Sequence, residues 1–239
     1  NASYWVGLAK CRFAAEDCEK AIEACDFALA ADDKCGEAYA YRGHSYFYLN
    51  NSDAAIEDYK KAIKYKALPP EMGYMFLGLT YSNKEAWKEA DDYYQRVIDR
   101  FIEEGLGNSP LLIDTYTNKA VAASRLGKYE EAHQLCKKAI AIQPDDPAIY
   151  LAEGKLYIQE NQKKKAVKSF DKALTMEPSA EMWYMVASAY SDAEYLYQAK
   201  LCFQEAYRID PNYADIAEKL SVLSLMHNEI DDFFKYNNE

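Results

Sequence analysis

The 239-residue chain has little of what most enzymes and membrane proteins need. Its three histidines, His44, His133 and His227, are far apart and form no HExxH or similar metal-binding pattern. It has no GxSxG motif and no glycine–lysine phosphate loop. It also lacks an apolar run of about 18 residues, the length that a membrane span requires. We therefore expect a protein that is not an enzyme, with no catalytic residues, no cofactor, no metal and no membrane span.

Paired cysteines are absent as well. The six cysteines include no CxxC pair and no small-domain disulfide framework; they are Cys11, Cys18, Cys25, Cys35, Cys136 and Cys202. We interpret them as scattered, small apolar residues in a reducing compartment, which favours a cytoplasmic location. The alternative is a metal or redox cluster of the first three. Asn1-Ala2-Ser3 resembles the remnant of a cleaved tag, so a signal peptide or lipid anchor before it stays open.

Positive charge is also scarce. The net charge is -11 and the sequence pI is about 4.9, which opposes binding to polyanions and argues against a nucleic-acid partner. Half of the residues are hydrophobic, which is enough to predict an ordered chain.

What the chain does contain is one pattern repeated six times. An alanine recurs at steps of 34, 35, 42, 34 and 33 residues, at Ala21, Ala55, Ala90, Ala132, Ala166 and Ala199. Each unit opens on an aromatic residue, followed four positions later by a small one: Ala9, Gly43, Gly78, Ala120, Gly154 and Ala187. Large and small residues at helical spacing allow two antiparallel helices to approach closely. The pattern therefore predicts a series of helix pairs.

The last full unit carries the most specific motif. Between residues 180 and 213 it places Trp183, Ala187, Tyr190, Ala199, Phe203, Ala206 and Pro211 at the spacing typical of a tetratricopeptide unit. The chain resembles the tetratricopeptide repeat (TPR) family, although Arg12 and Ala123 stand where four other units have tyrosine. The resemblance implies an all-α fold, a right-handed superhelical solenoid of antiparallel helix pairs (α-α superhelix), with six repeats and a C-terminal capping helix.

We expect one solenoid domain over residues 1–239. Its repeats cover about 2–35, 36–69, 71–104, 113–146, 147–179 and 180–213, and a capping helix and terminal segment follow over 214–239. The 42-residue step predicts an extended helix, a glycine-rich loop and a new helix with Ser109 as N-cap and Pro110 at its first position. This insertion is either a tolerated one or a hinge or lip beside a binding groove.

The resemblance also implies a function. In this family the first helix of each repeat lines a concave groove that holds a peptide or a partner's helix. Carried over by position, the groove residues are Tyr41, His44, Tyr48, Met72, Met75, Phe76, Leu79, Asn83, Asn118, Val121, Arg125, Lys155 and Tyr184. We therefore expect a non-enzymatic protein–protein interaction scaffold or adaptor. Its partner would place an apolar or aromatic anchor between the second and third units. The alternative for Tyr41 and Phe76 is packing between neighbouring helices.

Two further expectations concern partners. Family members that hold the acidic tails of heat-shock chaperones use lysine, asparagine and arginine at fixed groove positions, and only Asn118 matches, so we expect no such clamp. A second hypothesis is a structural module that self-associates through its terminal helices, as a homodimer through the C-terminal one. It rests on apolar residues in excess of what a cap needs: Val222, Leu225, Met226, Phe233 and Phe234. Alternatively, the terminal segment folds back over that helix.

Overall fold

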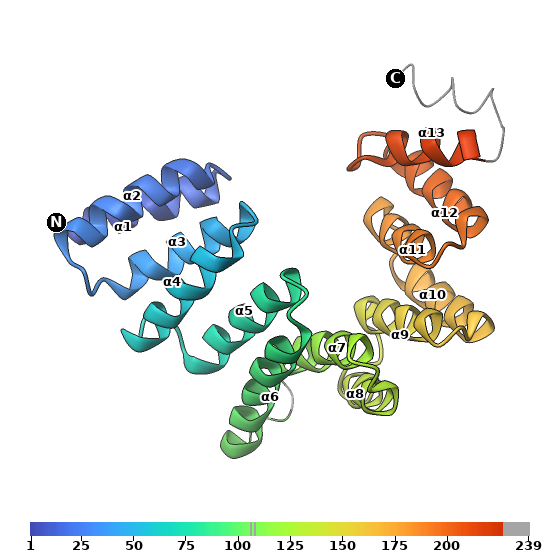
Figure 1. Cartoon of the computed structure of the whole chain (residues 1–239), viewed down its shortest axis with the longest axis horizontal. Coiled ribbons are helices and arrows are strands. Elements are labelled where there is room, and N and C mark those ends of the chain that lie inside the picture. The colour runs from blue at the N-terminus through green and yellow to red at the C-terminus, as the bar shows by residue number, and fades with distance from the viewer. Residues whose placement is uncertain (106, 108, 227–239) are drawn as a thin grey trace. The chain divides into compact units, whose positions relative to one another are not determined.

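The computed structural model describes residues 1–105, 107 and 109–226, and within them all regular structure is α-helical (Figure 1). Thirteen helices follow one another: α1 (Ala2–Ala14), α2 (Cys18–Ala31), α3 (Gly36–Tyr48), α4 (Ser52–Lys64), α5 (Pro70–Asn83), α6 (Trp87–Glu104), α7 (Pro110–Arg125), α8 (Tyr129–Ile142), α9 (Pro147–Gln159), α10 (Lys163–Met176), α11 (Ala180–Asp192), α12 (Leu196–Ile209) and α13 (Ile216–Met226). The expected all-α class is confirmed.

The helices pack as successive hairpins, as the repeat pattern predicts. The two helices of a repeat lie against each other in the pairs α1–α2, α3–α4, α5–α6, α9–α10 and α11–α12, and α13 packs on α12. The chain divides into two compact units, Asn1–Lys128 and Tyr129–Glu239, which are described separately below. The expectation that all repeats form one domain stays a prediction.

Local sequence signals account for the helix ends. Side chains of Asp17, Asn51 and Asp146 accept hydrogen bonds from the backbone N–H groups at the starts of α2, α4 and α9. The extension of α6 to Glu104 and the restart at Ser109-Pro110 are confirmed, although the Ser109 side chain makes no capping hydrogen bond. The α6 helix ends at Gly105, whose φ of 67° lies in the left-handed region.

The recurring alanines lie at the centre of the packing. All six anchor alanines are fully buried. In the third repeat the first helix places Gly78 against the ring of Tyr94, and a Cβ atom on Gly78 would lie 2.5 Å from that ring. Gly43 faces Tyr59, and Gly154 faces Phe170, in the same way. The close approach expected from the small residues is therefore present in these repeats.

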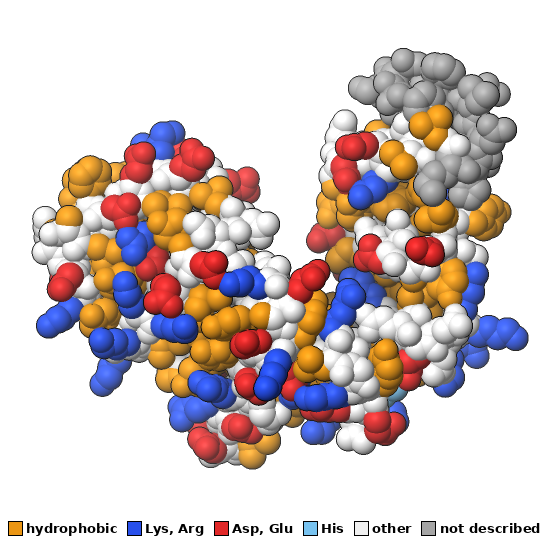
Figure 2. Space-filling model, in the orientation of Figure 1, with side chains coloured by type: hydrophobic (Ala, Val, Ile, Leu, Met, Phe, Trp, Pro, Cys, Tyr) orange, Lys and Arg blue, Asp and Glu red, His pale blue; other side chains and the backbone are white. Residues whose placement is uncertain are grey.

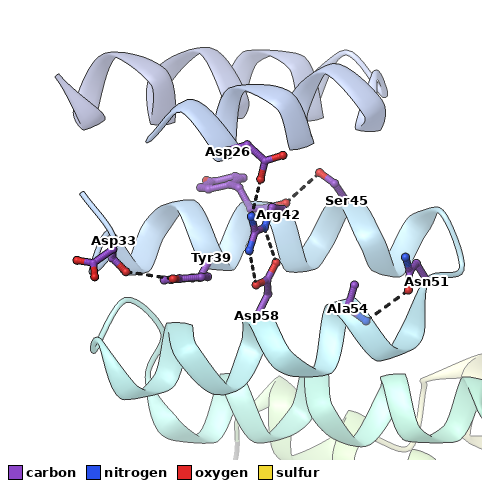
Figure 3. A network of polar contacts seen from close by, with 9 residues as sticks. Asp26, Asp33, Tyr39, Arg42, Ser45, Asn51, Ala54 and Asp58 are labelled. Atoms are coloured by element: carbon purple, nitrogen blue, oxygen red, sulfur yellow. Dashed lines mark hydrogen bonds and ion pairs between the residues drawn. The ribbon is translucent and has the colours of Figure 1, made fainter. Parts of the chain in front are cut away.

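An arginine connects the first two repeats (Figure 3). Arg42 on α3 donates to both carboxylate oxygens of Asp58 on α4, at 2.7 and 2.9 Å, and to Asp26 on α2 at 2.5 Å. The two carboxylates raise the pKa of Arg42, chiefly through the hydrogen bonds to Asp58. Such a two-point contact between guanidinium and carboxylate fixes geometry as well as charge. It thus sets the register between α2, α3 and α4.

A second ion pair connects the third and fourth repeats. Lys119 on α7 and Asp91 on α6 are both buried and contact each other, and Lys128 donates to the same carboxylate at 2.8 Å. Burial opposes ionisation of Asp91, but the hydrogen bonds from the two lysines outweigh it and hold its pKa below the ordinary value. The carboxylate of Asp91 is therefore buried inside the first unit together with a lysine of opposite charge.

Candidate functional site

An aromatic cluster lies on the first helices of the first two repeats. Its members are Phe13 on α1 and Tyr41, His44 and Tyr48 on α3, and we call these four residues the aromatic cluster. The ring centroid of Phe13 is 6.1 Å from that of Tyr41, 5.9 Å from His44 and 5.5 Å from Tyr48. Three of the four residues were expected in the groove. Phe13 was missed.

His44 joins the cluster to the core. Its Nδ1 is 3.0 Å from the hydroxyl of Tyr59, and its ring centroid is 4.6 Å from that of Phe76. Burial lowers the pKa of His44 to about 4, so the imidazole is neutral at physiological pH. Phe76 in turn stacks on Tyr59, with centroids 5.3 Å apart. His44 and Phe76 therefore pack between helices and support the rings above them.

Exposure separates the predicted residues that a partner can reach from those it cannot. Tyr48 is 71% exposed and Met72 is 40% exposed. Leu79 is half-buried and Asn83 is exposed. Met75 is buried, and its sulfur accepts a hydrogen bond from the Thr115 hydroxyl at 3.6 Å because α7 packs against α5. Met75 thus contributes to the core rather than to the accessible surface.

The remaining predicted residues lie away from the aromatic cluster in sequence. Asn118 donates to the carbonyl of Asp114 at 2.8 Å, and the Arg125 guanidinium lies 5.5 Å from the centre of the Trp87 ring. Val121 is half-buried. Lys155 and Tyr184 belong to the second unit, where both are half-buried. The Tyr184 hydroxyl donates to Asp215 at 2.6 Å, and this hydrogen bond, followed by burial, raises its pKa to about 12.

A cavity of about 770 Å³ adjoins the aromatic cluster. We call it the acidic pocket, because its lining combines three carboxylates with apolar side chains: Phe13, Ala14, Glu16, Asp17, Cys18, Glu19, Tyr48 and Leu49. These residues come from the turn between α1 and α2 and from the end of α3. Tyr48 and Leu49 are both exposed large side chains. Figure 2 shows hydrophobic side chains exposed in patches over the first unit, with charged groups between them.

The described part of the chain offers neither a metal site nor a membrane-spanning helix. Among residues 1–105, 107 and 109–226, no group of three or more histidine, cysteine, aspartate or glutamate side chains is arranged to hold a metal ion. None of the helices in these residues has the length and apolar character needed to cross a bilayer. The expected location in the cytoplasm stays a prediction.

With this architecture established, the chain can be compared with known proteins. Family models described as tetratricopeptide repeat match residues 71–145, residues 124–189, and residues 36–67 with 180–213. The chain therefore belongs to the tetratricopeptide repeat family, and the expected resemblance is confirmed. Proteins with this fold generally mediate protein–protein interactions.

Curated relatives are much longer than this chain. It is 28% identical over 182 residues to the human protein O-mannosyl-transferase TMTC3. This alignment covers 69% of this chain and 20% of the relative. It is 27% identical over 146 residues to a DnaJ homolog subfamily C member 7 homolog of Dictyostelium discoideum, covering 57% of this chain and 27% of the relative. The chain thus spans about a fifth to a quarter of these relatives.

Solved structures agree on the fold. A tetratricopeptide repeat protein of Parabacteroides merdae aligns with a TM-score of 0.74 at 19% identity, over 93% of this chain and 84% of that one. The type IV pilus biogenesis factor PilW aligns with a TM-score of 0.67 at 19% identity, over 93% of this chain and 97% of PilW. A chain of the APC/C hetero-tetramer Cut9-Hcn1 aligns with a TM-score of 0.65 at 18% identity. The alignment covers 93% of this chain and 42% of that one. At these identities the likeness is one of fold.

Proposed function

We propose that this chain is a non-enzymatic scaffold that binds a peptide or a partner protein through the first helices of its second and third repeats. The observation that carries the proposal is the exposed edge of the aromatic cluster, where Tyr48 is 71% exposed beside the half-buried ring of Phe13. Large aromatic side chains that stay accessible on a folded surface are typical of recognition hot spots. Met72 adds a flexible apolar side chain on α5.

The partner would bury an apolar or aromatic side chain against these residues. The aromatic cluster rests on the buried ring of Tyr59 and the partly buried ring of Phe76, which stack on each other and both contact His44. A firm base of this kind keeps the exposed rings in place, so a partner loses little free energy in ordering them. One of the relatives is named as a transferase, but the match covers only 20% of that protein. We therefore assign no reaction to this chain.

The test is a selection from a phage-displayed random peptide library on the immobilised chain, followed by fluorescence polarisation of the selected peptides. We expect Tyr48→Ala, and separately Met72→Ala, to weaken binding, with Tyr48→Ala costing about tenfold in Kd. Tyr197→Ala removes another exposed tyrosine, 61% accessible, from α12 and serves as the matched control. Selected peptides that bind all variants equally would remove this surface from the proposal.

Self-association through the terminal helices is the second candidate. At one end Tyr4 is 67% exposed and Phe27 is 55% exposed, and Phe27 stacks on Trp5. At the other, Val222 and Leu225 on α13 are 51% and 54% exposed. Two such apolar surfaces are more than a helical cap needs. Phe233 and Phe234, on which this hypothesis also relied, lie outside the described residues.

A further inference from the structure

The acidic pocket differs in chemistry from the aromatic cluster beside it. The cluster offers rings, whereas the pocket adds the carboxylates of Glu16, Asp17 and Glu19 to the side chains of Phe13 and Tyr48. We propose that the pocket binds a positively charged side chain of the partner, arginine or lysine, next to the apolar anchor held by the aromatic cluster. This inference rests on the proposed function and specifies the chemistry of its partner.

Only two of the three carboxylates in the pocket can form an ion pair with a ligand. Asp17 accepts from Lys20 Nζ at 2.6 Å, lies 4.0 Å from Arg12 and also caps α2 through the Lys20 backbone N–H at 3.3 Å. It therefore holds the local structure together. Glu16 and Glu19 are exposed, and in the part of the chain that the structure describes no cation lies within ion-pair distance of either. These two carboxylates are the ones that can pair with a ligand.

Helix ends of both polarities surround the pocket. The pocket lies where α1 ends at Ala14 and α3 ends at Tyr48, and where α2 begins at Cys18. The carboxyl ends of α1 and α3 carry partial negative charge and attract cations, whereas the amino end of α2 carries the opposite partial charge. The thiol of Cys18, in the pocket wall, responds to this environment: burial raises its pKa, and the charges of Asp17 and Glu16 raise it further. The exposed carboxylates of Glu16 and Glu19, rather than the helix ends, therefore decide which sign of ligand suits the pocket.

The aromatic wall adds to the selection of a cation. A guanidinium or ammonium group in the pocket would lie beside the rings of Phe13 and Tyr48 as well as the carboxylates, and a cation placed over the face of such a ring is attracted to it. The fold already uses such contacts, since Lys10 lies 5.4 Å from the centre of the Tyr41 ring and Arg42 lies 5.6 Å from that of Tyr39. An arginine fits best, because its flat group can stack on a ring while it donates to a carboxylate.

The position of Glu16 is set by the fold. Its φ of 60° places it in the left-handed region, and the equivalent turn residue takes the same conformation in the other repeats: Asn50, Glu85, Gly127, Asn161 and Glu194. The turn itself is therefore a repeated structural feature, whereas the combination of carboxylates with Phe13 and Tyr48 belongs to the first turn. This location makes the pocket a specific feature of the first two repeats.

Three capped dipeptides test the proposal: acetyl-Phe-Arg amide, acetyl-Phe-Gln amide and acetyl-Phe-Glu amide, each titrated into the isotope-labelled chain and followed by NMR chemical shifts. We expect the arginine probe to bind most tightly and to shift the signals of residues 13–19, 48 and 49. Glu16→Gln with Glu19→Gln should weaken its binding about fivefold. Glu16→Lys with Glu19→Lys should make the glutamate probe the preferred one.

The matched control is Glu57→Gln with Glu89→Gln, which removes the same charge from exposed positions elsewhere in the first unit. The arginine probe should bind this variant as it binds the wild type. Equal binding of the arginine and glutamine probes to the wild type, or no binding of the arginine probe, would overturn the inference. If the glutamine probe binds as tightly as the arginine probe and Tyr48→Ala abolishes the binding of both, the proposed function stands while the inference fails.

Discussion

At the scale of single residues, the fold depends on pairs of opposite size. Where a glycine on the first helix of a repeat meets a ring on the second, the two backbones approach more closely than any side chain would allow. The small residues and the rings could be predicted from their spacing alone, because they recur at fixed positions. Their mutual distances could not.

Gly78→Ala tests this contact. The new methyl group would overlap the buried ring of Tyr94, which cannot move within a close-packed interior, so we expect a loss of about 2 kcal/mol in the free energy of unfolding. Gly7→Ala is the control, because nothing lies within 4 Å of its added Cβ. In a helix interior that change should stabilise by up to about 1 kcal/mol. Urea unfolding of both variants measures the difference, and a Gly78→Ala protein as stable as wild type would contradict the packing described.

Residue patterns were less informative about the site. Tyr48 and Met72 were predicted as groove residues and are exposed, but Met75, one turn away from Met72 on the same helix, is buried. Its burial depends on Thr115 of the next repeat, which sequence spacing does not reveal. Phe13 was missed because the mapping began at the second repeat. Phe13 could have been identified from the sequence, because it is an aromatic residue at the end of the first helix.

At the scale of helices, local chemistry made most boundaries predictable. The prolines at the starts of α7 and α9 and the carboxylate of Asp146 act within one turn, so their effect can be read from neighbouring residues. The acidic pocket could not be anticipated in this way. It forms where the turn after α1 meets the end of α3, and only the packing of α1 on α3 brings these segments together.

The contact between α6 and α7 predicts a dependence of stability on pH. The pKa of Asp91 is lower in the folded chain than its ordinary value of 3.8, so its ionised form stabilises the fold above that pH. The contribution is lost as the pH falls through the lowered pKa. We expect Asp91→Asn to destabilise by about 3 kcal/mol at neutral pH, because it removes the buried carboxylate charge that accepts from both Lys119 and Lys128.

Chemical denaturation at a series of pH values measures this effect. The difference between wild type and Asp91→Asn should be constant at neutral pH and shrink below pH 3.8. Asp92→Asn, the exposed neighbour on the same helix, should change stability by less than about 0.5 kcal/mol throughout. A constant gap between Asp91→Asn and wild type into strong acid would show that charge is not the cause.

At the scale of the whole molecule, the repeat period predicted the family, and with it the all-α class and the number of helix pairs. It could not predict the division into two compact units, because that boundary falls inside the fourth repeat, between α7 and α8, and this repeat carries the same anchors as the others. The oligomeric state is likewise a property of the ends, which the period does not constrain.

Self-association through α13 makes a distinct prediction at this scale. Light scattering of the chain should give a molar mass that rises with concentration toward twice 27.3 kDa, and Val222→Glu with Leu225→Glu should remain at the monomer mass. Leu201→Glu with Tyr197→Glu, which alters exposed apolar residues of α12, is the control and should keep the wild-type behaviour. A monomer at all concentrations contradicts self-association and leaves peptide binding untouched.

The matching of sizes inside each repeat has a consequence for how such chains can change. In the second, third and fifth repeats a glycine faces a ring, whereas in the first repeat Ala9 is buried in the same cluster as the much smaller Cys25. Transplanting the second helix of the third repeat into the first would therefore put the ring of Tyr94 into the space that Cys25 fills beside Ala9. Exchanging both helices together would keep the fit. The hairpin, rather than the single helix, is thus the smallest segment that gene duplication or protein engineering can shuffle without repacking the interior.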